Sequence, residues 1–184
     1  WSLSSNTYLQ NSISVSENGS GYRGYKPNDQ NDLTRDDDMQ LDKNSFKAAT
    51  TFNHKFNAQH NLQAGLIYTR HSFDFHSNYF DEETAQFVNE QGMKGTADHY
   101  QGFVSWKYRP WKDISVVSGF HVQKISMNDD ISVEPRASVK WQFHPHQALT
   151  AGFGMHGKME SLTNYYSIVA AEDGSTSMPN KSLD

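Results

Sequence analysis

The glycine-rich run from Gly152 to Gly157 has residue types and spacing that could bind a dinucleotide. It reads Gly-Phe-Gly-Met-His-Gly after an apolar segment, and Glu172 follows at a distance suited to a ribose contact. That chemistry also needs a helix and a second parallel strand within about thirty residues. The remaining sequence is instead rich in Asn, Gly and Ser, which are typical of loops. We therefore predict that Gly152 and Gly154 let a strand bend, and we expect no cofactor.

The chain has nine histidines, and two close pairs, His71 with His76 and His144 with His146, could bind a metal. Metal sites need ligands that converge, usually with a supporting carboxylate. These histidines instead scatter over turns, loops and both faces of the predicted strands. Solvated or interfacial histidines are therefore the favoured interpretation, and no metal site is predicted. A haem or metal ligand on an outer loop is the alternative.

An acidic cluster around Asp36, Asp37 and Asp38 could hold calcium, but it lacks the alternating Asp and central Gly of a calcium loop. We predict a solvated loop, with binding of a divalent cation as the alternative. No grouping of nucleophile, base and oxyanion donors is visible in the sequence. The chain is therefore not predicted to be an enzyme, and no catalytic residue is assigned.

Alternation of apolar and polar residues predicts that antiparallel strands position these side chains. The segment 45–56 alternates, turns at 57–60 and resumes over 62–69, which is the pattern of a hairpin. The same unit recurs at 100–122 around a turn at 110–113, and at 133–155 around a turn at 144–147. With 9–15, the sequence predicts seven strands and an all-β fold.

The connections between these hairpins are much longer than the turns within them. They cover about 17–44, 77–97 and 158–184, and only 128–130 is short. Short turns at one end and long loops at the other are typical of a transmembrane antiparallel β-barrel with short periplasmic turns and long extracellular loops. Phe56, Tyr108, Trp111, Trp141 and Phe143 lie near the short turns and are predicted to form an interfacial belt.

Composition agrees with a folded, polar and aromatic-rich chain. Hydrophobic residues make up 35%, aromatic residues 13%, and the mean hydropathy is −0.79. A net charge of −5 with dispersed Lys and Arg excludes a nucleic-acid footprint. No run approaches the roughly 18 apolar residues of a membrane helix. Seven strands do not close a barrel, and open edges in lipid leave unpaired backbone groups. We therefore expect residues 1–184 to form part of an outer-membrane β-barrel whose other strands lie elsewhere.

The run Glu134-Pro135-Arg136-Ala137-Ser138-Val139-Lys140-Trp141, a His-Pro-His turn, the strand 149–156 and the pair Tyr165-Tyr166 carry a family resemblance. The chain resembles the barrel of TonB-dependent receptors, particularly those of Bacteroidetes. The resemblance implies a roughly 22-stranded barrel in the bacterial outer membrane, with an N-terminal plug outside this sequence. It implies import of a scarce ligand, such as an iron-siderophore, a cobalamin or a glycan. Implied partners are outer-membrane lipid, the TonB complex through the plug, and a surface lipoprotein.

The resemblance also gives residues in this part of the chain a role. Glu134, Arg136 and Lys140 share the lumen-facing register, which predicts a charge network that holds the plug to the wall. Pro135 gives no ladder donor, so a bulge is predicted there.

Two other protein classes fit the alternation. A soluble or cell-surface β-sandwich could bind carbohydrate through exposed aromatic residues, and a different outer-membrane barrel could serve assembly or adhesion. In a sandwich the rings of Phe52, Trp106, Trp141 and Phe153 would face a second sheet, whereas in a barrel they would lie on the convex outer wall. The candidates for ligand contact in the loops are Tyr79, Tyr165 and Tyr166.

Overall fold

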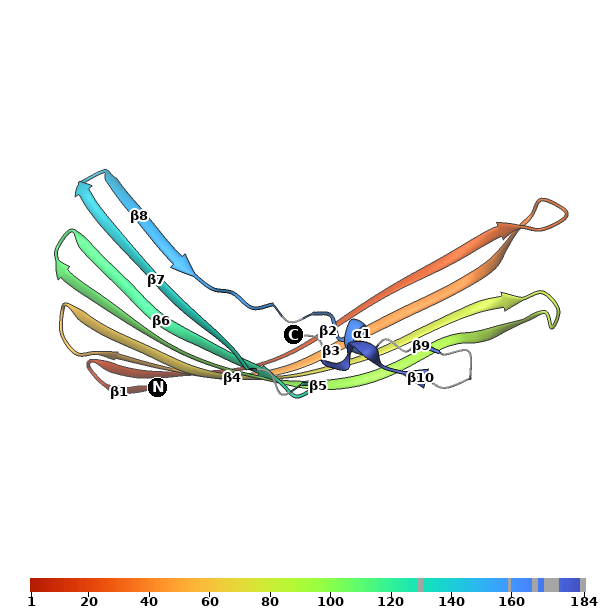
Figure 1. Cartoon of the computed structure of the whole chain (residues 1–184), viewed down its shortest axis with the longest axis horizontal. Helices are drawn as coiled ribbons and strands as arrows, with labels where there is room; N and C mark the ends of the chain where they lie inside the picture. Colours follow the sequence, from red (N-terminus) through yellow and green to blue (C-terminus); the bar gives the residue numbers. More distant parts are fainter. Residues whose placement is uncertain (129–130, 159, 167–168, 171–175, 183–184) are drawn as a thin grey trace.

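A single curved sheet of eight antiparallel strands, hydrogen-bonded in sequence order, makes up most of the molecule. The computed structural model describes residues 1–184 except 129–130, 159, 167–168, 171–175 and 183–184. The sheet is open and bends into a trough, with a short helix on its concave side (Figure 1). Its strands are β1 Ser2–Ser4, β2 Thr7–Pro27, β3 Leu33–Lys55, β4 His60–Asp81, β5 Gln86–Trp111, β6 Ile114–Ile125, β7 Ile131–His144 and β8 Gln147–Gly154.

The predicted hairpins and their tight turns are confirmed. β3 leads into β4 through 56–59, β5 into β6 through 112–113, and β7 into β8 through 145–146. These turns lie at one end of the sheet (Figure 1). The seven predicted strands correspond to β2 through β8, and the structure adds the three-residue β1 at the edge.

The long polar connections predicted over 17–44 and 77–97 are present, but most of their residues form strands and not loops. Both segments continue the flanking strands as long hairpins, which turn at 28–32 and 82–85 and extend beyond β6 to β8 (Figure 1). Ladder hydrogen bonds join backbone groups and do not require apolar side chains. A strand with polar residues on both faces shows no alternation of apolar and polar residues. The period-2 pattern is therefore absent from the parts of the strands that lie outside the apolar region of the sheet.

Ion pairs join the strands of the first long hairpin, and one ion pair joins that hairpin to the second. Lys26 Nζ lies 2.8 Å from Asp36 Oδ1 and 2.8 Å from Glu82 Oε1, so it joins the first hairpin to the second. The hydrogen bond to Asp36, followed by that to Glu82, holds the pKa of Lys26 above its usual value. Asp38 pairs with Arg35 and, at 3.8 Å, with Arg23. Two carboxylates of the acidic cluster are therefore paired with protein cations.

The two faces of the sheet differ, as the alternation predicts. The register places Leu9, Phe52, Ala64 and Val104 side by side in one row of the convex face. The next row over, on the concave face, has Tyr8, Asn53, Gln63 and Ser105. Large apolar side chains are exposed across the convex face, including Leu66, Trp106, Phe120, Trp141 and Phe153.

The β-sandwich hypothesis is wrong for this chain. Trp106, Trp141 and Phe153 are 40%, 51% and 68% exposed on the convex face of the single main sheet. The only other sheet among the described residues has two very short strands, β9 Val169–Ala170 and β10 Thr176–Ser177. A pair of two-residue strands cannot cover the apolar face of eight strands.

Aromatic side chains gather near the short turns. Phe56 stacks on Trp106 with ring centroids 5.5 Å apart, and His60 stacks on Tyr108 at 4.6 Å. Trp106 Nε1 also donates to His60 Nδ1 over 3.1 Å. The rings predicted to form a belt, Phe56, Tyr108, Trp111, Trp141 and Phe143, are all between 39% and 68% exposed. This end of the wall therefore presents exposed aromatic rings, of which Tyr108, Trp111 and Trp141 are amphipathic.

The predicted bulge at Pro135 is not found. Pro135 pairs with Phe120 in an unbroken register between β6 and β7. Its carbonyl accepts from the amide of Met155, so its backbone polar groups point toward β8 and not β6. β8 ends at Gly154, so the missing donor of Pro135 falls where the ladder stops. No ladder hydrogen bond is therefore lost at Pro135, and no bulge is needed to accommodate it.

The chain after β8 folds back onto the concave face. Helix α1, Leu162–Tyr165, buries Leu162 and Tyr165 against Phe73, Ala97 and Ile125. A 3-10 turn, η1, covers Pro179–Ser182. Among the described residues, no helix has the length and apolar character needed to span a membrane.

A charge on the convex face should weaken the protein in a bilayer far more than the same charge on the concave face. Val104 lies midway along the apolar part of β5, so Val104→Arg is expected to cost about 2–4 kcal/mol of folding free energy in lipid. Gln63→Arg, one row away on the concave face, is the matched control. Refolding titrations into vesicles would measure both. Equal losses would contradict a lipid-facing convex wall.

Candidate functional site

The buried carboxylate of Glu134 is the centre of a polar network on the concave face. Glu134 is only 2% exposed. Arg136 Nη2 donates to Glu134 Oε2 over 2.6 Å, and Gln123 Nε2 donates to Oε1 over 2.8 Å. His121 Nδ1 lies 3.2 Å from Oε2, and the backbone amide of Gly157 donates to Oε1 over 2.8 Å. Both carboxylate oxygens therefore have two partners each.

Strand geometry brings these side chains together. Glu134 and Arg136 are two residues apart on β7, so they point to the same face. His121 on β6 pairs directly with Glu134, which places the imidazole beside the carboxylate. Further along the same face, His99 Nε2 on β5 lies 3.1 Å from Gln123 Oε1. The network thus spans three adjacent strands.

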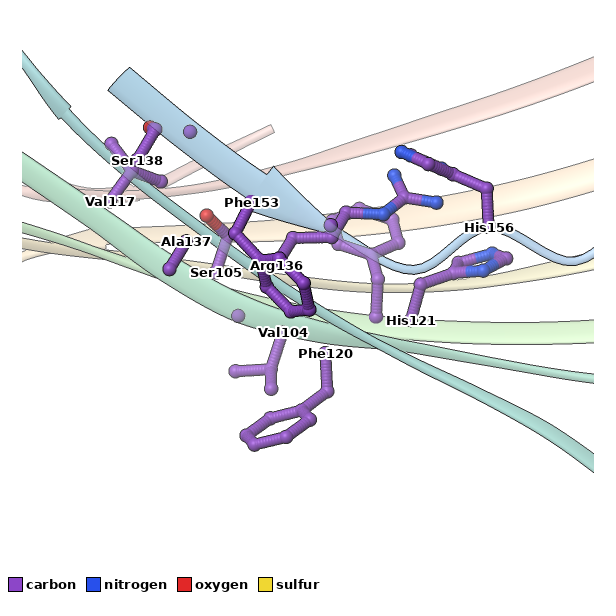
Figure 2. A pocket seen from close by; sticks show the side chains of 14 residues that line it. Val104, Ser105, Val117, Phe120, His121, Arg136, Ala137, Ser138, Phe153 and His156 are labelled. Carbon is purple, nitrogen blue, oxygen red and sulfur yellow. The ribbon is translucent and has the colours of Figure 1, made fainter. Parts of the chain in front are cut away.

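A hollow of about 580 Å³ lies beside this network. It is lined by side chains of β5 to β8 and by His156, which follows β8. In Figure 2 the guanidinium of Arg136 and the rings of His121 and His156 lie at one end of the hollow, on the concave side. Val104 and Phe120 point away from them, below the sheet. The hollow therefore offers cationic and neutral donors at one end, with small residues along its wall.

Glycines make room for this hollow. A Cβ on Gly154 would stand 3.2 Å from His156 Nε2 and 3.4 Å from Arg136 Cγ. A Cβ on Gly157 would approach Gln123 Nε2 to 2.8 Å and Glu134 Oε1 to 3.1 Å. Gly152 and Gly154 belong to β8 and do not precede a nucleotide-binding helix, since 155–158 has no regular structure and α1 spans only four residues. The run serves close packing at this site.

The predicted network of charged lumen residues is found in part. Glu134 and Arg136 form an ion pair, as their shared register indicated. Lys140 lies on the same face but is exposed, and no ion pair joins it to the network within the described ranges. Sequence reasoning missed His121, Gln123 and Gly157. The β6–β7 register places His121 opposite Glu134, whereas the position of Gly157 depends on a folded-back segment that has no sequence pattern.

The three tyrosines predicted to contact a ligand lie in different environments. Tyr79 is 41% exposed near the tip of the second long hairpin. Tyr165 is only 5% exposed and packs against Phe73 and Ala97. Tyr166 OH donates to the carbonyl of Thr96 over 2.9 Å, and its ring meets that of Phe73 at 5.2 Å. Two of the three therefore hold the folded-back segment in place.

The histidine pairs do not form metal centres with neighbouring side chains. His144 and His146 have ring centroids 5.8 Å apart at a turn, and His76 Nε2 lies 2.8 Å from Asp74 Oδ1. Within the part of the chain that the structure describes, no group of three or more His, Cys, Asp or Glu side chains could hold a metal ion.

Comparison with known proteins gives a family for the whole chain. Residues 1–184 match the sequence model of the family described as TonB dependent receptor-like, beta-barrel. The fold also matches a crystal structure of the siderophore receptor PirA from Pseudomonas aeruginosa, with a TM-score of 0.54 and 9% identity. That match covers 100% of this chain and 39% of the receptor, so the chain spans about two-fifths of that protein's length. No curated protein matches the sequence significantly.

Removing the Glu134 carboxylate should release the segment that follows β8. Glu134→Ala in the full-length protein is expected to lower the free energy of unfolding by about 2 kcal/mol, because the Gln123 amide and the Gly157 N–H lose their buried acceptor. It should also speed amide exchange at Gly157, whose donor loses its acceptor. Hydrogen exchange and denaturant titration would measure both. Glu90→Ala, at an exposed carboxylate, is the control, and an equal effect there would contradict the assignment.

Shortening Tyr165 should free α1 from the wall. Tyr165→Ala removes a ring from the apolar cluster and is expected to destabilise the fold-back by about 3 kcal/mol. Exchange in the peptide 160–166 should rise while the strands stay protected. Tyr79→Ala makes the same chemical change at an exposed position and should leave that peptide unaffected. If both variants behave alike, α1 is not held by this contact.

Proposed function

The chain belongs to the TonB-dependent receptor-like β-barrel family, and we propose that it is part of the wall of a receptor that imports a scarce ligand with energy supplied through TonB. In this proposal residues 1–184 are one section of the barrel, while a plug domain and further strands complete it. The sheet itself is open, with β1 and β8 at its edges. Unpaired edges cannot remain in hydrocarbon, which supports partner strands outside this section.

The observation that carries the proposal is the division of the sheet into an apolar convex face and a polar concave face. A lipid-facing wall needs exposed apolar side chains such as Leu66, Phe120 and Phe153, at 66%, 56% and 68%. A lumen needs polar groups, which the network around Glu134 supplies. The aromatic rings near the short turns suit the periplasmic boundary, so the long hairpins point outward.

We assign the concave polar network a role in holding neighbouring segments and not in catalysis. Glu134 already binds the Gly157 amide, and the exposed donors of Arg136 and His156 border the adjacent hollow. A plug domain would occupy this side of the sheet and could accept hydrogen bonds from the same groups. This role suits transport, because polar contacts between the wall and the plug can break when force is applied to the plug.

The ligand is proposed to be an iron-siderophore, a cobalamin or a glycan, and the receptor to be of the Bacteroidetes type, working with a surface lipoprotein. The motif from Glu134 to Trp141 and the pair Tyr165-Tyr166 support that type. Tyr79 is the exposed candidate for first contact on the outer hairpins. Tyr165 and Tyr166 would reach a ligand only after α1 leaves the wall, because Tyr165 is buried in the cluster that includes Phe73 and Tyr166 contacts the Phe73 ring.

Uptake by the full-length receptor tests this function. Cells that express it should accumulate one of three probes: a radiolabelled ferric siderophore, labelled cyanocobalamin or a fluorescent oligosaccharide. Accumulation should stop when TonB is deleted, and Tyr79→Ala should raise the half-saturating concentration severalfold while receptor levels stay constant.

Two results would overturn the proposal. One is accumulation that continues without TonB, which would indicate a passive pore or an assembly protein. The other is failure to take up any of the three probes by receptor that is shown to be folded in the outer membrane. Tyr8→Ala, an exposed tyrosine on the concave face far from the outer hairpins, is the matched control for Tyr79→Ala.

A further inference from the structure

The short-turn half of the sheet, which runs from Lys47 and its partner Thr69 to the three tight turns, has a basic concave face. Glu134 is the only carboxylate on this face among the described residues. More than half of the acidic residues lie instead in the long hairpins, and the whole chain has a net charge of −5. The cationic side chains that share the face with Glu134 are those of Lys47, Lys55, Lys107, Arg136 and Lys140. This part of the wall is therefore basic, in contrast to the chain as a whole.

The hollow of about 580 Å³ on this face has a floor of small residues. Gly119, Ser138 and Gly152 line it from the adjacent strands β6, β7 and β8. A Cβ on Gly119 would collide with the backbone carbonyl oxygen of Val104, so no larger residue fits at that position. Small residues in a strand let another backbone approach the sheet closely. The hollow therefore has room for a segment of a neighbouring chain or domain.

Two lysines stand beside this floor. Lys140 is two residues from Ser138 on the same face of β7, about 7 Å along the strand. Lys107 is at the β5 end of the row that contains Val117, Ser138 and Gly152, two strands and about 10 Å from Ser138. Both side chains are long enough to reach over the floor. A segment that lies on Ser138 would therefore meet positive charge on two sides.

Neither lysine has a partner in the part of the chain that the structure describes. No hydrogen bond or ion pair there involves Lys107 or Lys140. The carboxylate of Glu134 is already held by Arg136 and Gln123, so it does not neutralise them. Water solvates the two ammonium groups while this face is open. A segment that covers the face removes that water, and a covered ammonium without a partner is costly.

We propose that the plug domain of the receptor covers this hollow with an acidic segment, whose carboxylates pair with Lys107 and Lys140. The backbone of that segment lies close to Gly119 and Gly152, where the wall has no side chains. The inference rests on the proposed function, because it needs a plug inside the barrel. It deepens that function, since it assigns a sign of charge to the part of the plug that faces β5 to β8 and makes the contact dependent on ionic strength.

Zero-length coupling with a carbodiimide tests the contact in the unmodified full-length receptor, because this reagent joins an amine only to a carboxylate that touches it. Peptide mass spectrometry should find Lys107 and Lys140 joined to Asp or Glu residues of one plug segment. Lys94 and Asp74, whose side chains lie 2.6 Å apart, should couple in the same sample and show that the reagent is active.

The proposal is overturned if Lys94 couples to Asp74 but Lys107 or Lys140 reaches no carboxylate of the plug. Coupling of the two lysines to carboxylates of the barrel would overturn it as well, since the wall would then neutralise its own charge. Uptake that depends on TonB is measured separately with the wild type. Its failure would count against the proposed function, whereas the couplings report on the contact alone.

Charge reversal gives a second measurement. The double variant Lys107→Glu with Lys140→Glu should speed proteolysis of the coupled plug segment about tenfold, as expected for loss of a charged hydrogen bond. Lys112→Glu makes the same change in the turn between β5 and β6 and should leave that rate unchanged. A double variant that protects its plug as well as the wild type does would contradict the acidic contact.

Discussion

The hydrogen-bonded ladder between neighbouring strands is the constraint on which the rest of this structure depends. Inside a membrane no water satisfies backbone N–H and C=O groups, so every strand must be paired along its length. The ladder is continuous from β2 to β8, with one register shift in each of four of its six strand pairs. It continues beyond the apolar region into the polar hairpins that end near Pro27 and Asp81. Even Pro135 is accommodated, because its missing donor lies where β8 stops.

Because the ladder fixes the backbone, side chains are free to give the two faces different roles. The convex face carries exposed apolar and aromatic groups, some of them packed in pairs such as Phe56 with Trp106, as the proposed lipid-facing wall requires. The concave face carries the buried Glu134 and its partners, which hold the segment after β8 against the wall. Buried apolar residues gather only where α1 meets Phe73, among the described residues. The molecule is thus a wall stabilised by its ladder, with one small core where a connecting segment folds inward.

Sequence reasoning located the strands where it had a periodic signal and failed where that signal was absent. Alternation over 45–69 and 133–155 gave the correct hairpins, because lipid on one face and polar contacts on the other impose period two. Residues 17–44 are mostly polar, with only scattered apolar side chains such as Tyr22, Leu33 and Met39, so these strands show no sustained alternation in the sequence. Arg136 could be paired with Glu134 from spacing alone. His121 required a cross-strand register, and Gly157 required the path of a segment without regular structure.

The sequence by itself determined the class of the fold: antiparallel strands, tight turns at one end, and one apolar face, all of which follow from residue type and local spacing. Only the tertiary structure decided which side chains on different strands become neighbours. The burial of Tyr165 in a cluster with Phe73, the hydrogen bonds of Glu134 with His121, Gln123 and Gly157, and the hollow beside Arg136 all join residues distant in sequence. Their cause is the register between strands and the curvature of the sheet, which arise from the whole ladder and not from any single segment.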